Sequence, residues 1–263
     1  MALVCRPRIQ RVYFVVETLA SLQAEITQAQ RTLAGLEPKP LSASPLSFEH
    51  RLWAQSTLSG DALDYFQLND ELSAFYVADV AGSGVDAALV VVWLKTLLQG
   101  LKHQVGGADA GLLAQPLALL TLLDQELKAT GFNKHITLFY AVIDSKKAEL
   151  HYAVGGHFPM PILLSQGQAH YLEGRAMPIG LFTPARFRAY NCRLPQDFRL
   201  FLCSDGLLEL MPSVVNKDKE TLLLDVVNQA AGDIAQLEKV LHLANKDAWL
   251  DDIAMLSVGW SKV

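Results

Sequence analysis

Short β-rich runs separated by tight turns dominate the chain from residue 48 onward, and they limit its fold more than any other feature. Two connections, Asp144–Lys147 and Ser165–Gln168, are short enough to predict β-hairpins. Consecutive hairpins build antiparallel sheets, because parallel strands need longer crossover connections. The predicted strands are His50–Leu58, Leu72–Val80, Ile136–Asp144, Ala148–Gly155, Met160–Leu164, Arg186–Leu194, Arg199–Cys203 and Ile253–Val258.

Segments with helical periodicity lie before and after this group of strands. Strands grouped in the middle with helices around them indicate an α+β protein built in layers rather than a doubly wound parallel sheet. The chain has no G-x-G-x-x-G and no G-x-x-x-x-G-K-[ST] segment, so neither nucleotide-binding fingerprint is present. The predicted helices are Val85–Leu101, Pro116–Thr130, Asp218–Ala231 and Ile234–Ala244.

The first 37 residues carry a different pattern. Apolar residues alternate at spacings of three and four, which is the heptad signature of a helix with one narrow apolar seam. This pattern predicts a dimeric coiled coil through residues 12–36, although the same helix packed on its own domain is the simpler alternative. The seam consists of Val12, Val15, Leu19, Leu22, Ile26, Ala29, Leu33 and Leu36.

Prolines end this helix and divide the chain. Residues 38–47 are rich in proline and serine and read as a linker, because proline cannot continue a helix. We therefore expect a helical segment at 1–37, a linker at 38–47 and a compact domain at 48–263.

Charge and composition exclude several partners. The net charge of −5 gives no general attraction to nucleic acid or to an anionic membrane surface. No apolar run approaches the roughly 20 residues of a membrane-spanning helix. Cys5, Cys192 and Cys203 are far apart and lack C-x-x-C spacing, so neither a zinc site nor a structural disulfide is expected. We expect a cytoplasmic protein that binds neither nucleic acid nor membrane.

Acidic residues stand at the ends of several strands and after Gly60. A carboxylate at the rim of a buried strand loses hydration, and a cation usually compensates for that loss. Carboxylate oxygens favour Mg²⁺ or Mn²⁺, although a single Asp beside a strand is more commonly a turn or cap residue. The residues in question are Asp61, Asp79, Asp205, Asp251 and Asp252.

Two of these acids open glycine turns. Asp79 leads into Gly82-Ser83-Gly84 and then into a predicted helix, and Asp205 is followed at once by Gly206. Such acid pairs can hold two cations about 3.5–4 Å apart, a geometry that activates water for phosphoryl displacement.

Together these segments resemble the metal-dependent type 2C protein phosphatases, and most of all the bacterial SpoIIE-like branch. The resemblance covers roughly residues 48–260 and rests on motifs that follow one another in the family's order. They are Gly60-Asp61 with Asp64, Asp79–Gly84 with Ala87–Leu89, Thr137–Tyr140, Gly155–His157 with Pro159, Pro178–Leu181, Ser204–Gly206 and Asp251–Ile253.

The resemblance implies a four-layer α-β-β-α sandwich of two antiparallel sheets flanked by helices, with two Mn²⁺ or Mg²⁺ ions at one end. Asp79 is then the carboxylate that bridges both ions, and the main-chain carbonyl of Val80 is a further ligand. Asp205 and Asp251 complete the protein ligands, and Asp61 orients metal-bound water. Asp252 stands at a position that is often Asn or Asp in the family, so its role is less clearly implied than those of the other acids. The implied reaction is hydrolysis of phosphoserine or phosphothreonine in a protein by metal-activated water, without a phosphoenzyme.

Departures from the family pattern leave the metal positions intact. Ser83 stands where histidine is common, Ala62 replaces an aromatic residue, and Leu207 and Leu208 precede the acid Glu209. His157 suggests a general acid, but a structural histidine is at least as reasonable. Two further alternatives are a non-catalytic dimeric adaptor that binds a sigma factor or its regulator, and a structural module whose acids only cap strands.

The branch also suggests a biological role. Its members commonly follow receiver or sensory domains through a helical linker, so this chain is expected to act downstream of such a domain, as the effector part of an RssB-like response regulator. The expected substrate is a phosphorylated anti-sigma-factor antagonist. If two linker helices pair, their arrangement can transmit an upstream signal to the phosphatase domains.

Disrupting the heptad seam tests the predicted dimer. Leu19→Glu with Ile26→Glu places charges on the seam and should convert dimers to monomers, as measured by light scattering. A dimer that persists in the double variant would contradict the coiled-coil prediction.

Overall fold

The computed structural model describes residues 24, 27, 28, 31, 35–41, 45–55, 58–104, 111–212, 218–243 and 250–260. The chain divides into two compact units, Met1–Glu37 and Pro38–Val263. In the first unit Ala24, Thr27, Gln28 and Arg31 are helical. The seam positions from Val12 to Leu33 lie outside the described residues, so the pairing of two helices stays a prediction.

The second unit contains two five-stranded sheets in which every neighbouring pair of strands is antiparallel. Sheet A has the order β1-β10-β9-β6-β7, and sheet B has the order β2-β3-β4-β5-β8. Sheet A consists of β1 (Leu46–Trp53), β10 (Ile253–Trp260), β9 (Arg199–Cys203), β6 (Ile162–Ser165) and β7 (Gln168–Tyr171). Sheet B consists of β2 (Asp61–Gln67), β3 (Leu72–Val80), β4 (Ile136–Asp144), β5 (Glu149–Gly155) and β8 (Ala189–Arg193).

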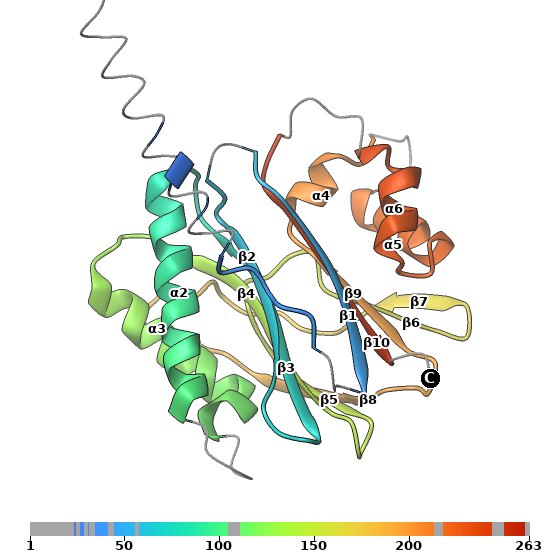
Figure 1. Ribbon diagram of the computed structural model, residues 1–263, viewed down its shortest axis with the longest axis horizontal. Helices are drawn as coiled ribbons and strands as arrows, with labels where there is room; N and C mark the ends of the chain where they lie inside the picture. The colour runs from blue at the N-terminus through green and yellow to red at the C-terminus, as the bar shows by residue number, and fades with distance from the viewer. Residues whose placement is uncertain are drawn as a thin grey trace, which may run out of the picture. The chain divides into compact units, whose positions relative to one another are not determined.

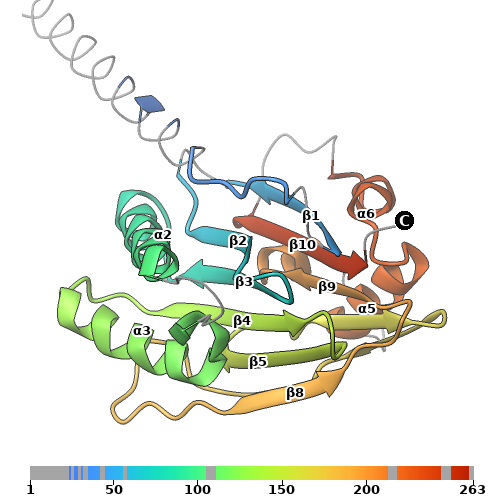
Figure 2. The ribbon, with the colours of Figure 1, turned by 60° about the horizontal axis from the view of Figure 1, so that its bottom comes forward.

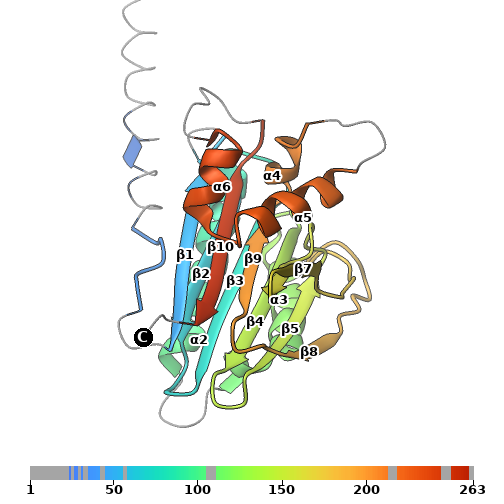
Figure 3. The same ribbon diagram turned by 90° about the vertical axis from the view of Figure 1, so that its right-hand side faces the viewer.

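Helices cover the two outer faces of the paired sheets. Figure 1 shows α2 and α3 on one side and α4, α5 and α6 on the other. Figure 2 shows α3 over β4, β5 and β8, and Figure 3 shows α5 and α6 beside the strands of sheet A. The helices are α2 (Val85–Gln104), the 3₁₀ turn η1 (Gly111–Ala114), α3 (Pro116–Thr130), α4 (Gly206–Glu209), α5 (Lys219–Gln229) and α6 (Ile234–Val240).

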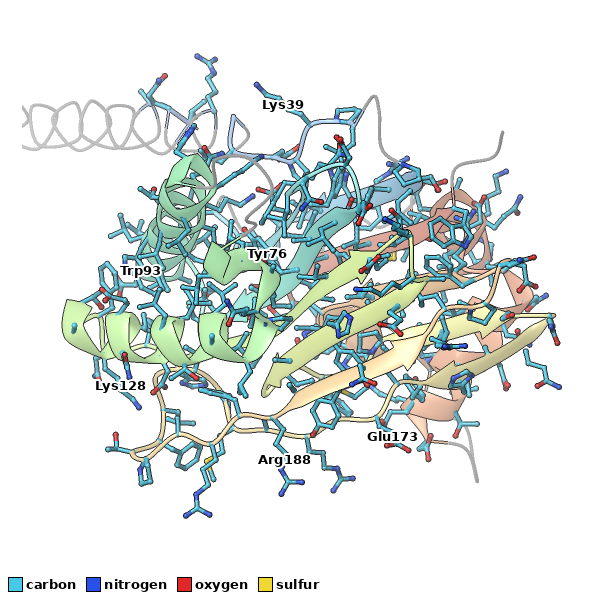
Figure 4. All side chains as sticks on the ribbon, turned by 90° about the horizontal axis from the view of Figure 1, so that it is seen from below. Lys39, Tyr76, Trp93, Lys128, Glu173 and Arg188 are labelled. Atoms are coloured by element: carbon cyan, nitrogen blue, oxygen red, sulfur yellow. The ribbon has the colours of Figure 1, made fainter. Side chains whose placement is uncertain are left out.

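Three apolar clusters fill the spaces between these layers. On β3, Phe75 and Val77 face sheet A, whereas Tyr76 and Ala78 face α2 and α3, as the two-residue period of a strand requires. Tyr76 is fully buried in this cluster, and Trp93 on α2 is partly buried against it (Figure 4). A third cluster joins sheet A to α5 and α6. The predicted four-layer α-β-β-α sandwich of the α+β class is confirmed.

The predicted strand boundaries are wrong in several places. The strand predicted at His50–Leu58 is β1, which runs from Leu46 to Trp53 and pairs with β10 along its whole length. It begins inside the stretch predicted as linker, because Leu46 is buried between the sheets. Strands β2 and β7 and the short helix α4 were not predicted. Strand β2 is buried on both faces, but Asp61 and Asp64 interrupt the apolar pattern by which a buried strand is predicted.

Capping residues explain where the helices begin and end. The Asp218 side chain accepts a hydrogen bond of 2.7 Å from the Thr221 N–H at the start of α5. Gly131 adopts a left-handed conformation (φ 73°) and ends α3. The helix predicted at Ile234–Ala244 ends at Val240. None of the helices in the described ranges is long and apolar enough to cross a membrane.

The inter-sheet core should dominate stability. Leu256 lies on β10, an interior strand of sheet A, and is fully buried, whereas Val240 at the end of α6 is 41% exposed. Leu256→Ala should lower the free energy of unfolding in urea by about 2–5 kcal/mol, because it removes packed methyl groups and leaves a cavity. The control Val240→Ala should cost less than about 1 kcal/mol. Equal losses in the two variants would contradict this assignment of the core.

Candidate metal centre

Asp61 and Asp79 lie directly opposite each other on neighbouring strands of sheet B. Asp61 opens β2, Asp79 is the next-to-last residue of β3, and the register pairs the two residues. Cross-strand partners project on the same face, so both carboxylates lie on the side of the sheet that faces sheet A. Like charges in directly opposed positions are unfavourable, which makes this pair unusual unless a cation lies beside it.

Sheet A supplies the other acids at the same end of the sandwich. Asp205 follows β9, and Asp251 and Asp252 precede β10. The two strands are antiparallel, so the end of β9 lies beside the start of β10. Ser204 fixes this junction: its N–H donates to the Ala254 carbonyl at 3.0 Å, and its hydroxyl accepts from the Ala254 N–H at 2.9 Å. We call Asp61, Asp79, Asp205, Asp251 and Asp252 the acidic cluster.

Two short hydrogen bonds tie the sheets together at the acidic cluster. The Ser204 hydroxyl of sheet A donates to Oδ2 of Asp61 in sheet B at 2.6 Å. Oδ2 of Asp252 accepts from the Gly60 N–H at 2.6 Å, and its Oδ1 accepts from the Gln55 N–H at 2.7 Å. Both oxygens of Asp252 are thereby bound to the main chain, which favours a positioning role for this residue.

Glycines let the main chain approach closely here. A Cβ atom on Gly60 would lie 3.0 Å from the Val80 carbonyl oxygen and 3.2 Å from that of Gly82. A Cβ atom on Gly206 would overlap the Asp252 carbonyl. Gly206 is therefore required sterically, and a side chain at Gly60 would force the neighbouring carbonyl groups to move by a few tenths of an ångström.

Mutual repulsion shifts the protonation of the cluster. Burial and the charges of Asp205, Asp251 and Asp252 raise the pKa of Asp79 to about 7, and a hydrogen bond from Thr137 opposes part of this shift. Burial, assisted by Asp79, raises the pKa of Asp61, while its bond to Ser204 opposes the rise. Burial and Asp251 also raise the pKa of Asp205. The site therefore favours either protons or an added positive charge.

The donor set suits a hard divalent cation. All five acids offer carboxylate oxygens, and the Val80 carbonyl lies at the same edge, which is the ligand chemistry of Mg²⁺ and Mn²⁺. Among the described residues, no three acidic, histidine or cysteine side chains converge closely enough to hold one ion. A bound cation would have to draw the carboxylates together against the repulsion that raises their pKa values.

His157 lies in a different environment. It is 4% exposed, its ring lies 6.1 Å from the Phe139 ring, and neither ring nitrogen has a hydrogen-bond partner among the described atoms. Burial lowers the pKa of His157 to about 4, so the ring is neutral at physiological pH. This geometry favours the structural interpretation of His157 over a general acid.

Sequence reasoning assigned no role to Ser204 or Thr137. Ser204 links Asp61 to the start of β10. Thr137 lies on β4 opposite Asp79, and its side-chain hydrogen bond lowers the pKa of Asp79. Ser204 stands within one of the quoted motifs, but its bond to Asp61 joins two segments 143 residues apart, and only the fold brings them together.

The layered fold and the carboxylates at one end of it define a type 2C phosphatase fold. The SiaA-PP2C domain of Pseudomonas aeruginosa shares this fold, with a TM-score of 0.72, 19% identity, and 93% of this chain and 99% of that chain covered. Residues 69–261 match the family described as Stage II sporulation protein E (SpoIIE), and the chain belongs to this family. The predicted SpoIIE-like branch is thereby confirmed.

Two further proteins are similar to this chain. Phosphoserine phosphatase RsbP of Bacillus subtilis is 26% identical over 190 residues, which cover 70% of this chain and 45% of RsbP. A crystal structure of RsbX in complex with magnesium has a TM-score of 0.58 at 14% identity and covers 82% of this chain and 96% of that chain. The chain spans about half the length of the relatives matched by sequence.

The raised pKa of Asp79 predicts an unusual pH dependence. Without divalent cations, the folded state holds a proton on Asp79 that the unfolded state loses above its ordinary value of 3.8. The folded state then binds more protons, so stability falls as the pH rises from about 4 to 7. In EDTA at pH 8, Asp79→Asn should be more stable than the wild type by about 1 kcal/mol or more in urea unfolding.

The matched control for this prediction is Asp70→Asn. Asp70 is exposed in the turn between β2 and β3, at the opposite end of sheet B, and its loss should leave the pH profile unchanged. A wild-type protein whose stability rises over the same pH range would contradict the electrostatic picture of the cluster.

Proposed function

We propose that this chain is a metal-dependent protein serine/threonine phosphatase. The observation that carries the proposal is the acidic cluster at one end of a type 2C fold, where burial and the charges of neighbouring carboxylates raise the pKa of Asp79 to about 7. Supporting it, the relative RsbP is named a phosphoserine phosphatase. Phosphoryl transfer is a reaction in which charge neutralisation by divalent cations supplies much of the catalysis.

In this proposal each residue of the site has a defined task. Asp79, Asp205, Asp251 and the carbonyl of Val80 hold two Mg²⁺ or Mn²⁺ ions, and the related RsbX structure with magnesium supports that choice of ions. Bound cations would supply the Lewis acidity that makes water nucleophilic near neutral pH. Asp61, oriented by the Ser204 hydroxyl, accepts a hydrogen bond from the attacking water. Asp252 holds the Gly60 main chain so that Asp61 stays opposite Asp79.

The substrate we propose is a phosphoserine or phosphothreonine regulator, such as an anti-sigma-factor antagonist. The family resemblance and the phosphoserine phosphatase relative support this class. An upstream receiver or sensory domain, dimerisation through residues 12–36 and a cytoplasmic location complete the proposal. The adaptor alternative is disfavoured, because no proposed metal position is replaced.

Phosphatase assays test this proposal. With Mn²⁺ or Mg²⁺, the protein should hydrolyse p-nitrophenyl phosphate and a phosphoserine peptide, and EDTA should abolish turnover. Asp79→Asn and Asp205→Asn should each lower kcat/KM by about 100-fold or more, because each removes a proposed ligand. Asp70→Asn is the matched control and should keep wild-type rates. A folded, Mn²⁺-bound protein without turnover would contradict the phosphatase and favour the adaptor.

A further inference from the structure

Lys134 is held against the loop that follows Asp79. It lies in the connection between α3 and β4 and is half-buried. Its Nζ donates to the Ala81 carbonyl at 3.1 Å, and the Ala81 N–H donates to the carbonyl of His135 at 3.0 Å. Main-chain and side-chain hydrogen bonds together therefore hold the ammonium group beside Ala81, which follows Asp79 by two residues in the sequence.

A short series of contacts connects this ammonium group to the acidic cluster. A Cβ atom on Gly82 would lie 2.8 Å from Lys134 Nζ, and Gly82 adopts a φ of +89° that favours glycine. The Gly82 carbonyl oxygen lies 3.2 Å from the position of a Cβ atom on Gly60, whose N–H is bound by Asp252. The absence of a side chain at Gly82 leaves room for the ammonium group beside the loop that follows Asp79.

Three lysines near sheet B form ion pairs, whereas Lys134 forms none within the described ranges. Lys128 pairs with Asp124, Lys146 with Glu71 and Lys147 with Asp144. Within the described ranges no carboxylate lies at ion-pair distance from Lys134, and its hydrogen-bond partner is a neutral carbonyl. An ammonium group has three donors, so donors remain available for an anion.

We propose that Lys134 binds the phosphoryl oxygens of the substrate, an inference that rests on the proposed phosphatase function. A phosphate monoester carries nearly two negative charges at neutral pH, and the carboxylates of the site repel it. Lysine binds phosphate as a point charge through charge-assisted hydrogen bonds. In this proposal the bond to Ala81 holds Nζ beside the loop that follows Asp79, from which it offsets this repulsion and positions the phosphorus for attack.

The alternative role for Lys134 is purely structural, as a link between the Ala81 loop and β4. The two roles differ in their readouts. A structural link affects Mn²⁺ affinity and thermal stability, whereas a phosphate-binding group affects affinity for phosphate and leaves Mn²⁺ affinity nearly unchanged. Lys134→Met removes the charge and keeps much of the side-chain length, and Lys134→Arg keeps the charge.

Binding of inorganic phosphate to the full chain with saturating Mn²⁺, measured by titration calorimetry, tests the proposal independently of turnover. Lys134→Met should weaken phosphate binding about 10- to 100-fold, with Mn²⁺ affinity within twofold of the wild type. Lys134→Arg should recover most of the loss. Lys146→Met removes a lysine at the opposite end of sheet B and is the matched control, with phosphate affinity unchanged.

Steady-state kinetics with the phosphoserine peptide complete the test. Lys134→Met should lower kcat/KM about 10- to 100-fold and raise the inhibition constant for phosphate by a similar factor. Phosphate affinity within twofold of the wild type in Lys134→Met would overturn the proposal, as would a loss of Mn²⁺ affinity that accounts for the whole effect. A wild type that binds phosphate but hydrolyses nothing, together with the expected loss of phosphate affinity in Lys134→Met, would refute the phosphatase function and leave the phosphate site at Lys134 standing.

Discussion

The burial of several carboxylates at one end of two facing sheets is the constraint on which the site depends. Asp61 and Asp79 are cross-strand partners in sheet B, and Asp205 and Asp251 come from the strand ends of sheet A. The Ser204 bond to Asp61 and the Asp252 bond to Gly60 hold the sheets in this arrangement. The packing of the inter-sheet core offsets the free-energy cost of burying these like charges. A bound cation or a proton lowers that cost.

This arrangement explains why the site needs the whole sandwich. In the proposed site the oxygen ligands come from both sheets, so the site depends on the inter-sheet core that packs the two sheets face to face. Residues without ionisable groups matter as much as the acids: Gly60 and Gly206 leave room for carbonyl oxygens that any side chain would displace. The buried like charges lower the stability of the cation-free fold, and in the proposed function they bind the cations.

Much of the fold and of the site could be predicted from sequence because the determining signals are local. The hairpin turns at Asp144–Lys147 and Ser165–Gln168 and the apolar run of β3 each lie within one short segment. Strand β2 could not be predicted from periodicity, since Asp61 and Asp64 interrupt its apolar pattern and only tertiary burial makes it a strand. The link from Ser204 to Asp61 and the place of Lys134 beside Gly82 were equally hidden, because each depends on distant segments meeting in the fold.

Calorimetric titration of the protein with Mn²⁺ at pH 6 and pH 8, in buffers of different ionisation enthalpy, tests the central claim most directly. If burial and like-charge repulsion hold a proton on Asp79 near neutral pH, Mn²⁺ binding at pH 6 should release about one proton and should be weaker than at pH 8. In Asp79→Asn both the proton release and most of the affinity should be lost. Equal affinity at the two pH values, with no proton release and no effect of Asp79→Asn, would contradict the account.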